Sequence, residues 1–143
     1  MASEQVCSAI HFEVAGQPVG KARPRITRQG RAYTPAKTLE AEERIRQKAR
    51  QMMGPWEPIK GPVYAWLHFH MEVPKSWPKK KREDALAGRI WPAGKPDSDN
   101  LAKTVLDACN EVIFQDDGQV VELTVHKVYS GRPRTAISIG QIQ

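Results

Sequence analysis

The chain has 143 residues, a usual size for one domain, and it can bury a core without disulfides or structural metals. Its 22 Lys and Arg outnumber its 16 Asp and Glu, and the net charge is +6. We expect one domain over residues 1–143, loosely held over residues 1–8. The sequence has neither a signal core nor a run of about 18 apolar residues, so we expect a cytoplasmic protein with no membrane segment.

The two cysteines, Cys7 and Cys109, are too few for a disulfide framework or a four-cysteine zinc site. They favour a reducing compartment. Cys109 lies among apolar residues of an expected helix, which indicates a small buried side chain.

The first half of the domain begins with alternating apolar residues, which predict a strand over residues 10–14. An exposed, stiff loop is expected over residues 20–25, and its simplest role is that of a solvated connector. Thr34 is a suitable N-cap for a long helix that reaches residue 51 or 52 and stops at Gly54.

A strand is predicted next over residues 63–73, where every other side chain is apolar. Its opposite face carries Tyr64, Trp66, His68 and His70. The two histidines could chelate a metal, but without a third ligand nearby a structural or surface role is the better interpretation. The aromatic side chains indicate that this second face is partly covered, and a dimer partner could cover it.

The remaining elements are a short basic helix over residues 79–86, a helix over about 98–113, and strands near 121–126 and 136–139. The order strand, helix, strand, helix, strand, strand predicts an α+β fold. We expect a single domain in which a mixed β-sheet packs with two main helices.

Basic side chains are clustered in two stretches. Between residues 21 and 50, ten Lys and Arg stand against three Glu, and residues 79–82 are all basic. Such clusters are typical of nucleic-acid-binding proteins. The candidate DNA contacts are Lys21, Arg23, Arg25, Arg28, Arg31, Lys79, Lys80, Lys81 and Arg82.

Two acidic clusters interrupt this basic chain: Asp97 with Asp99, and Asp116 with Asp117. Taken alone, the first could be a helix cap and the second a tight turn. Together with Lys103, which shares a helix face with Asp99, they favour a site for Mg²⁺ or Mn²⁺, because these ions bind a few carboxylates and leave positions for phosphate. Asp117 must then return to the first cluster through the tertiary fold.

Phosphodiester hydrolysis is the chemistry that needs this set of groups. A carboxylate-bound metal can generate hydroxide and stabilise the leaving oxygen. Lys103 could neutralise charge that develops on the scissile phosphate. A metal-dependent nuclease is therefore the leading hypothesis.

The segments 95–103, 106–108 and 116–120, with 16–25 and 33–35 near the start, resemble the RusA family of Holliday junction resolvases, which bacteria, phages and prophages encode. The resemblance extends from about residue 10 to residue 139. It implies an α+β homodimer that binds four-way DNA junctions and makes paired symmetric cuts with Mg²⁺ or Mn²⁺ in DNA recombination and repair.

The same resemblance implies roles for individual residues. Asp97, Asp99 and Asp117 match the family's essential aspartates and would bind the metal, and Lys103 matches its essential lysine. Asp116 matches a neighbouring acidic position.

Two alternatives remain open on the sequence. One is a branched-DNA binding protein whose metal site is vestigial or structural, and the other is a less specific phosphodiesterase. Mg²⁺-dependent cleavage of a synthetic junction distinguishes the first from a resolvase, and comparison with a linear duplex distinguishes the second.

Overall fold

The computed structural model describes residues 8–142. Cys7 and most of the segment expected to be loose lie outside the described residues. The centre of the molecule is a four-stranded sheet in the order β1-β6-β4-β5. β1 (Ala9–Ala15) and β4 (Val63–Glu72) both pair antiparallel with β6 (Arg134–Gln141), whereas β4 pairs parallel with β5 (Val120–Ser130). The sheet is therefore mixed, as predicted.

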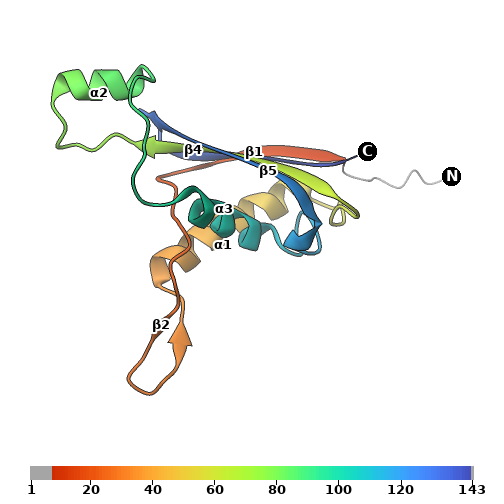
Figure 1. Cartoon of the computed structure of the whole chain (residues 1–143). Coiled ribbons are helices and arrows are strands. Elements are labelled where there is room, and N and C mark those ends of the chain that lie inside the picture. Colours follow the sequence, from red (N-terminus) through yellow and green to blue (C-terminus); the bar gives the residue numbers. More distant parts are fainter. Residues whose placement is uncertain (1–7, 143) are drawn as a thin grey trace.

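Two helices, α1 (Ala36–Met53) and α3 (Ser98–Cys109), lie side by side on one face of this sheet (Figure 1). α1 presents Ala41, Ile45 and Ala49 to the core at intervals of four residues, which is the spacing of one helix face. The α+β fold with two main helices is confirmed. The largest fully buried side chains are Phe69, Phe114, Ile59, Leu67, Leu101, Ile113, Ile137 and Ile139.

Both helices differ from their predicted limits at one end. Pro35, not Thr34, is the N-cap residue of α1, and its carbonyl oxygen accepts the backbone N–H of Thr38 at 3.1 Å. α3 ends at Cys109 and not at residue 113, because the chain turns at Glu111, which has a φ of 65° and donates its N–H to the Phe114 carbonyl at 2.7 Å.

The expected loop over residues 20–25 belongs to a projecting β-hairpin, here called the arm (residues 20–35). It contains β2 (Arg25–Ile26) and β3 (Ala32–Tyr33), which pair only with each other. The arm has no core of its own, and Ile26 is 74% exposed. The strands are too short for an apolar alternation, so no local pattern predicts them.

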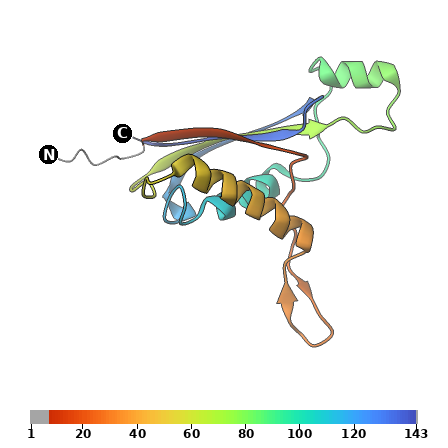
Figure 2. The same ribbon diagram turned by 180° about the vertical axis from the view of Figure 1, so that it is seen from behind.

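The third helix, α2 (Lys79–Leu86), has the limits that the sequence predicted. α2 and the arm project from the same end of the sheet, on its two sides (Figures 1 and 2). The loop from α2 to α3 runs between them. Among the described residues, no helix is long and apolar enough to cross a membrane.

The sheet face opposite the helices is left open by the described elements (Figure 2). Trp66 is 54% exposed there, and the rings of His68 and His126 stack with centroids 4.7 Å apart. Tyr64 packs against Gly140, where a Cβ atom would overlap its ring. The expectation that a dimer partner covers this face stays a prediction.

This open face should make stability depend on pH. Burial, and then the neighbouring His126, lower the pKa of His68 below its ordinary value of 6.5. Burial, followed by the charge of Arg134, lowers the pKa of His70. The unfolded chain therefore binds more protons than the folded one as the pH falls below 6.5, so this contribution to stability is complete above that pH and is lost below it.

The measurement is the urea midpoint of unfolding at about pH 7.5 and about pH 5.5. We expect the midpoint to fall more in the wild type than in the His68→Gln/His70→Gln double variant. Equal decreases in the two proteins would show that these histidines do not contribute.

Candidate functional site

The first acidic cluster lies where the chain enters α3. Asp97 is the N-cap residue, with an extended backbone (φ −68°, ψ 151°), and Asp99 lies in the first helical turn. The Asp97 carboxylate accepts a hydrogen bond from Lys95 at 2.9 Å and is 46% exposed. Asp99 and Lys103, one turn apart, are exposed as well. The backbone is therefore extended at Asp97 and helical at Asp99, and both carboxylates are accessible to solvent.

Lys127, on β5, holds the backbone immediately before Asp97. Its ammonium donates to the carbonyl oxygens of Gly94 at 2.8 Å and Pro96 at 2.7 Å. Sequence reasoning did not single out Lys127, although a signal existed. It pairs with buried Phe69 and occupies an inward position in the alternation of β5, where an apolar side chain would be expected.

Lys21 lies between the two main helices and not on the surface of the arm. Its ammonium binds Glu42 of α1 and Asp107 of α3, the latter at 3.1 Å, and its side chain is only 19% exposed. Its backbone N–H donates to the Asn100 carbonyl at 2.8 Å. Burial alone would lower the pKa of Lys21, but the hydrogen bonds to the two carboxylates outweigh burial and raise it. Lys21 therefore carries its charge and fixes the base of the arm on α3.

Gly20 allows this close approach. A Cβ atom at residue 20 would lie 2.8 Å from the Cβ of Pro96 and 3.4 Å from that of Asn100. Glycine, which has no side chain, is therefore the residue at position 20 that lets the arm contact the start of α3.

The second acidic cluster forms a short 3₁₀ turn, η1 (Asp117–Gln119). The Asp116 carboxylate accepts the N–H of Gly118 at 2.9 Å, and the Gln119 side chain accepts the N–H of Asp116 at 3.1 Å. The Asp116 carboxylate thus stabilises the turn, which is the role that a tight-turn motif predicts for it. Among the described residues, no hydrogen bond engages the Asp117 carboxylate, which is half-buried.

The two acidic clusters lie at opposite ends of α3. The helix has 12 residues, which corresponds to a length of about 18 Å. Lys127 reaches Pro96 at one end, whereas at the other the Gln119 side chain donates to Ile59 and Gly61, close to the start of β4. Figure 1 shows the chain entering α3 at the end near α2 and leaving it at the other.

The structure therefore groups Asp97, Asp99 and Lys103 on α3 but does not bring Asp117 to them. Within residues 8–142, no group of three or more His, Cys, Asp or Glu side chains is placed to hold a metal ion. Sequence reasoning about separate motifs could not determine this distance.

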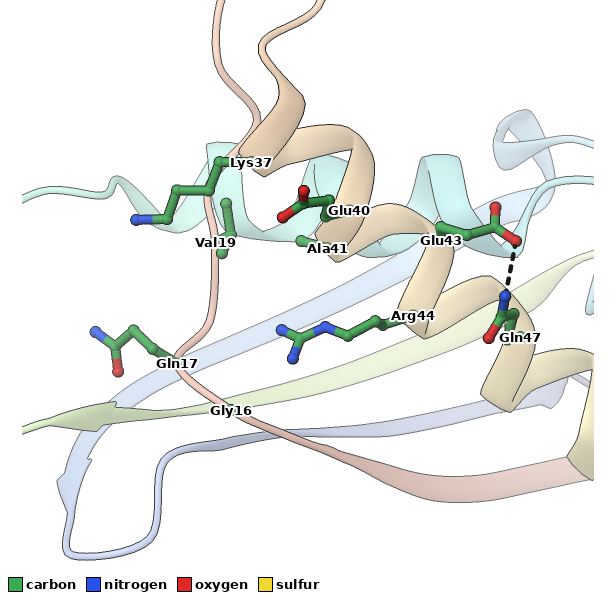
Figure 3. A pocket seen from close by; sticks show the side chains of 9 residues that line it. All are labelled: Gly16, Gln17, Val19, Lys37, Glu40, Ala41, Glu43, Arg44 and Gln47. Atoms are coloured by element: carbon green, nitrogen blue, oxygen red, sulfur yellow. Dashed lines mark hydrogen bonds between the residues drawn. The ribbon is translucent and has the colours of Figure 1, made fainter.

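A groove leads toward the first cluster. One part, about 580 Å³, lies between α1 and the segment after β1, where Lys37 and Arg44 line it (Figure 3). A second part, about 390 Å³, shares Gln17 and Lys37 with the first and reaches Lys95 beside Asp97. The first part is lined by Glu40 and Glu43 as well as by these two basic residues, and the second part, whose charged lining is all basic, ends beside Asp97.

The other candidate DNA contacts lie on the two projections. The arm carries Arg23, Arg25, Arg28 and Arg31, all exposed, and no acidic residue occurs between residues 14 and 39. On α2, Lys79, Lys80 and Lys81 are exposed, but Arg82 is half-buried and donates to the Pro74 carbonyl at 3.1 Å.

Cys109 is buried, as predicted. Burial raises the pKa of its thiol to about 12, so it remains protonated at neutral pH. It belongs to the core and not to the site.

Comparison with known proteins agrees with these motifs. A family model described as endodeoxyribonuclease RusA matches residues 15–140, which includes both acidic clusters and the arm. The chain belongs to the RusA family. Its resemblance to this family of Holliday junction resolvases is thereby confirmed. It is also 40% identical over 138 residues to the uncharacterized protein YqaN of Bacillus subtilis (strain 168), with 93% of this chain and 96% of the relative covered.

The role of Lys127 can be tested by Lys127→Met, which keeps the aliphatic stem but removes both hydrogen bonds to the loop. We expect the free energy of unfolding to fall by about 1–3 kcal/mol, since two carbonyl groups lose a charged donor. The matched control is Lys75→Met, at an exposed position. Urea unfolding measures both variants, and equal stabilities would show that Lys127 does not hold the loop.

Proposed function

We propose that this RusA-family protein is a Mg²⁺-dependent endonuclease that resolves four-way DNA junctions by paired cuts, acting as a homodimer in DNA recombination and repair. The observation that carries the proposal is the position of the start of α3, which bears Asp97, Asp99 and Lys103, between the two basic projections α2 and the arm. Phosphodiester hydrolysis needs carboxylates and a cation at the point where DNA is held.

The proposed DNA path follows the basic surfaces. The arm starts beside Asn100, near the start of α3, and carries four exposed arginines, so a DNA strand held along the arm would reach the acidic cluster at the arm's base. Lys37 and Lys95 line the groove that leads to the same point. Lys21 fixes the base of the arm in this scheme and does not contact phosphate.

Asp97 and Asp99 supply the hard oxygen ligands that Mg²⁺ takes when it binds through one or two carboxylates, and Mn²⁺ should substitute. When bound, such an ion would lower the pKa of a water molecule and polarise the phosphate. Lys103 adds a positive charge next to the scissile group. The full set of three aspartates does not come together within one chain.

That separation favours one competing function, a branched-DNA binding protein with no working metal site. A fluorescently labelled synthetic junction distinguishes the two. Binding without cleavage in the presence of Mg²⁺ or Mn²⁺ would support the binding protein, and cleavage of junction and linear duplex at equal rates would support a general phosphodiesterase.

The aspartates give the first prediction on activity. Asp97→Asn, Asp99→Asn and Asp117→Asn should each lower the junction cleavage rate by more than about 10²-fold, because each loses a charge on which metal catalysis depends. Junction affinity should stay near that of the wild type. Glu83→Gln, an exposed carboxylate on α2, is the control. Wild-type cleavage in any aspartate variant would remove that residue from the mechanism.

The arm gives a second prediction, which concerns DNA binding. Arg23→Ala combined with Arg25→Ala should weaken junction binding and flatten the plot of log affinity against log salt by roughly 1–2 units, since fewer counterions are released. The matched control, Lys48→Ala with Arg50→Ala, removes the same charge from the far end of α1. If both pairs changed the slope equally, the arm would have no special contact with DNA.

A further inference from the structure

We propose that a small apolar pocket beside α2 receives one unpaired nucleobase of the DNA substrate, with the indole ring of Trp91 as its stacking partner. This inference rests on the proposed function, because it assigns a further contact to the same substrate. The loop from α2 to α3 carries Trp91 and leads directly to Asp97 (Figure 1). A base in this pocket would therefore belong to a nucleotide near the scissile phosphate.

The pocket has a volume of about 270 Å³ and lies between the end of α2, the loop that follows it and β5. Its apolar walls include Leu86, Ile90, Trp91, Val128 and Tyr129. Among the described residues, none that lines the pocket is charged. The volume is slightly below the range of about 300–1,000 Å³ that drug-sized ligands occupy, so the pocket suits a ligand with a single flat ring system.

Two large apolar side chains of this pocket are exposed to solvent. Trp91 is 62% exposed, more than any other Trp, Tyr or Phe of the described chain, and Leu86 is 51% exposed. Neither belongs to the buried core cluster. An indole ring at the mouth of a pocket offers a flat apolar face, which a nucleobase can cover by stacking.

The walls of the pocket are held in place by contacts within the chain. At the end of α2, the backbone N–H of Arg89 donates to the Asp84 carbonyl at 2.9 Å, and its guanidinium donates to the Asp84 carboxylate at 2.8 Å. On β5, the Tyr129 ring packs edge-on against Trp77 with centroids 5.3 Å apart. A pocket with fixed walls loses little conformational entropy when it binds a ligand.

The charges around the pocket favour a nucleic acid over an apolar segment of a protein. Residues 79–95 contain six Lys and Arg against two acidic residues. One of the two, Asp84, is already paired with Lys80 at 3.1 Å and with Arg89 at 2.8 Å. An uncharged aromatic pocket within a positive surface is the combination that binds single-stranded nucleic acid, because the cations attract phosphates while the rings stack with bases.

The pocket is also close to the first acidic cluster. Tyr129 and Lys127 lie two residues apart on the same side of β5, about 7 Å along the strand. Lys127 in turn binds the carbonyl oxygen of Pro96, next to Asp97. The segment from Trp91 to Asp97 spans at most about 22 Å. The base in the pocket would therefore lie within a few nucleotides of a phosphate at Asp97.

A four-way junction supplies such a base at a lower cost than a linear duplex does. When the junction is open, each base pair at the branch point has a neighbouring pair on one side only. A base that is already partly unstacked costs least to extrude. The pocket would thus add affinity for the branch point, whereas the phosphate contacts of the basic projections are the same in both kinds of DNA.

Abasic nucleotides test the proposal in binding assays with EDTA, where no strand is cut. A series of synthetic junctions carries one abasic nucleotide at each position near the branch point in turn. The affinity of the wild type should fall by about fivefold or more at one position, which is the low end of the contribution of a base–aromatic stack. Trp91→Ala should weaken binding to the intact junction by a similar factor and show no further loss at that position. Equal abasic losses in the two proteins at every position would overturn the proposal.

Further variants separate stacking from other roles of this side chain. Trp91→Phe keeps an aromatic ring and should keep most of the affinity for the junction, whereas Trp91→Leu keeps only an apolar side chain and should not. Trp91→Ala should bind a linear duplex as the wild type does. An equal loss for junction and duplex would mean that Trp91 contacts the sugar–phosphate backbone, and it would overturn the base pocket.

The matched control is Trp56→Ala, which removes a 38% exposed indole before the start of β4, at the opposite end of that strand from α2. All its affinities should equal those of the wild type, and a loss that followed the same abasic position would overturn the assignment to Trp91. Because Trp91 is exposed, the urea midpoints of its variants should match that of the wild type.

Junction cleavage distinguishes failure of this inference from failure of the proposed function. A wild type that shows the expected abasic pattern but does not cut in the presence of Mg²⁺ would overturn the proposed endonuclease and support the pocket. A wild type that cuts, but whose abasic losses do not depend on Trp91, would overturn the pocket and support the endonuclease. Absence of junction binding would overturn both.

Discussion

The ammonium group of Lys21 connects the three parts from which the candidate site is built. It binds Glu42 on α1 and Asp107 on α3, while its own backbone belongs to the base of the arm. Glu42 is only 7% exposed, so its charge needs this cation. Loss of one member of a well-buried ion pair costs about 3–5 kcal/mol, because the remaining charge is left uncompensated. The relative positions of both helices and the arm therefore depend on one side chain.

Local patterns in the sequence were enough to predict the main elements. The strand β4 has clean alternation over its whole length, and α2 lies between Pro78 and Gly88, so both were located to within one residue. The end of α3 was missed because Val112 and Ile113 continue its apolar pattern while Glu111 has already left the helix. The pattern of burial continued after the backbone had turned.

The candidate site was predictable in composition but not in arrangement. The sequence identified Asp97, Asp99 and Lys103 because all three lie within one local motif. Asp117 belongs to the same chemistry, but its distance from them depends on the direction of β5 and the length of α3, which no local pattern contains. Lys21 also shows that a local sequence pattern cannot predict contacts between distant residues. The basic stretch predicts Lys21 as a DNA contact, whereas its two carboxylate partners come from distant helices that no local pattern relates to it.

The pairing of β1 with β6 also bears on how the chain folds. Ala9 lies opposite Gly140, so the first and last strands of the described residues are direct neighbours. β1 has no other partner in the sheet, because it forms one edge. During synthesis, β1 therefore has no strand to pair with until β6 has left the ribosome. In that interval its alternating apolar side chains are available to other chains. Contacts between residues so far apart in sequence also slow folding.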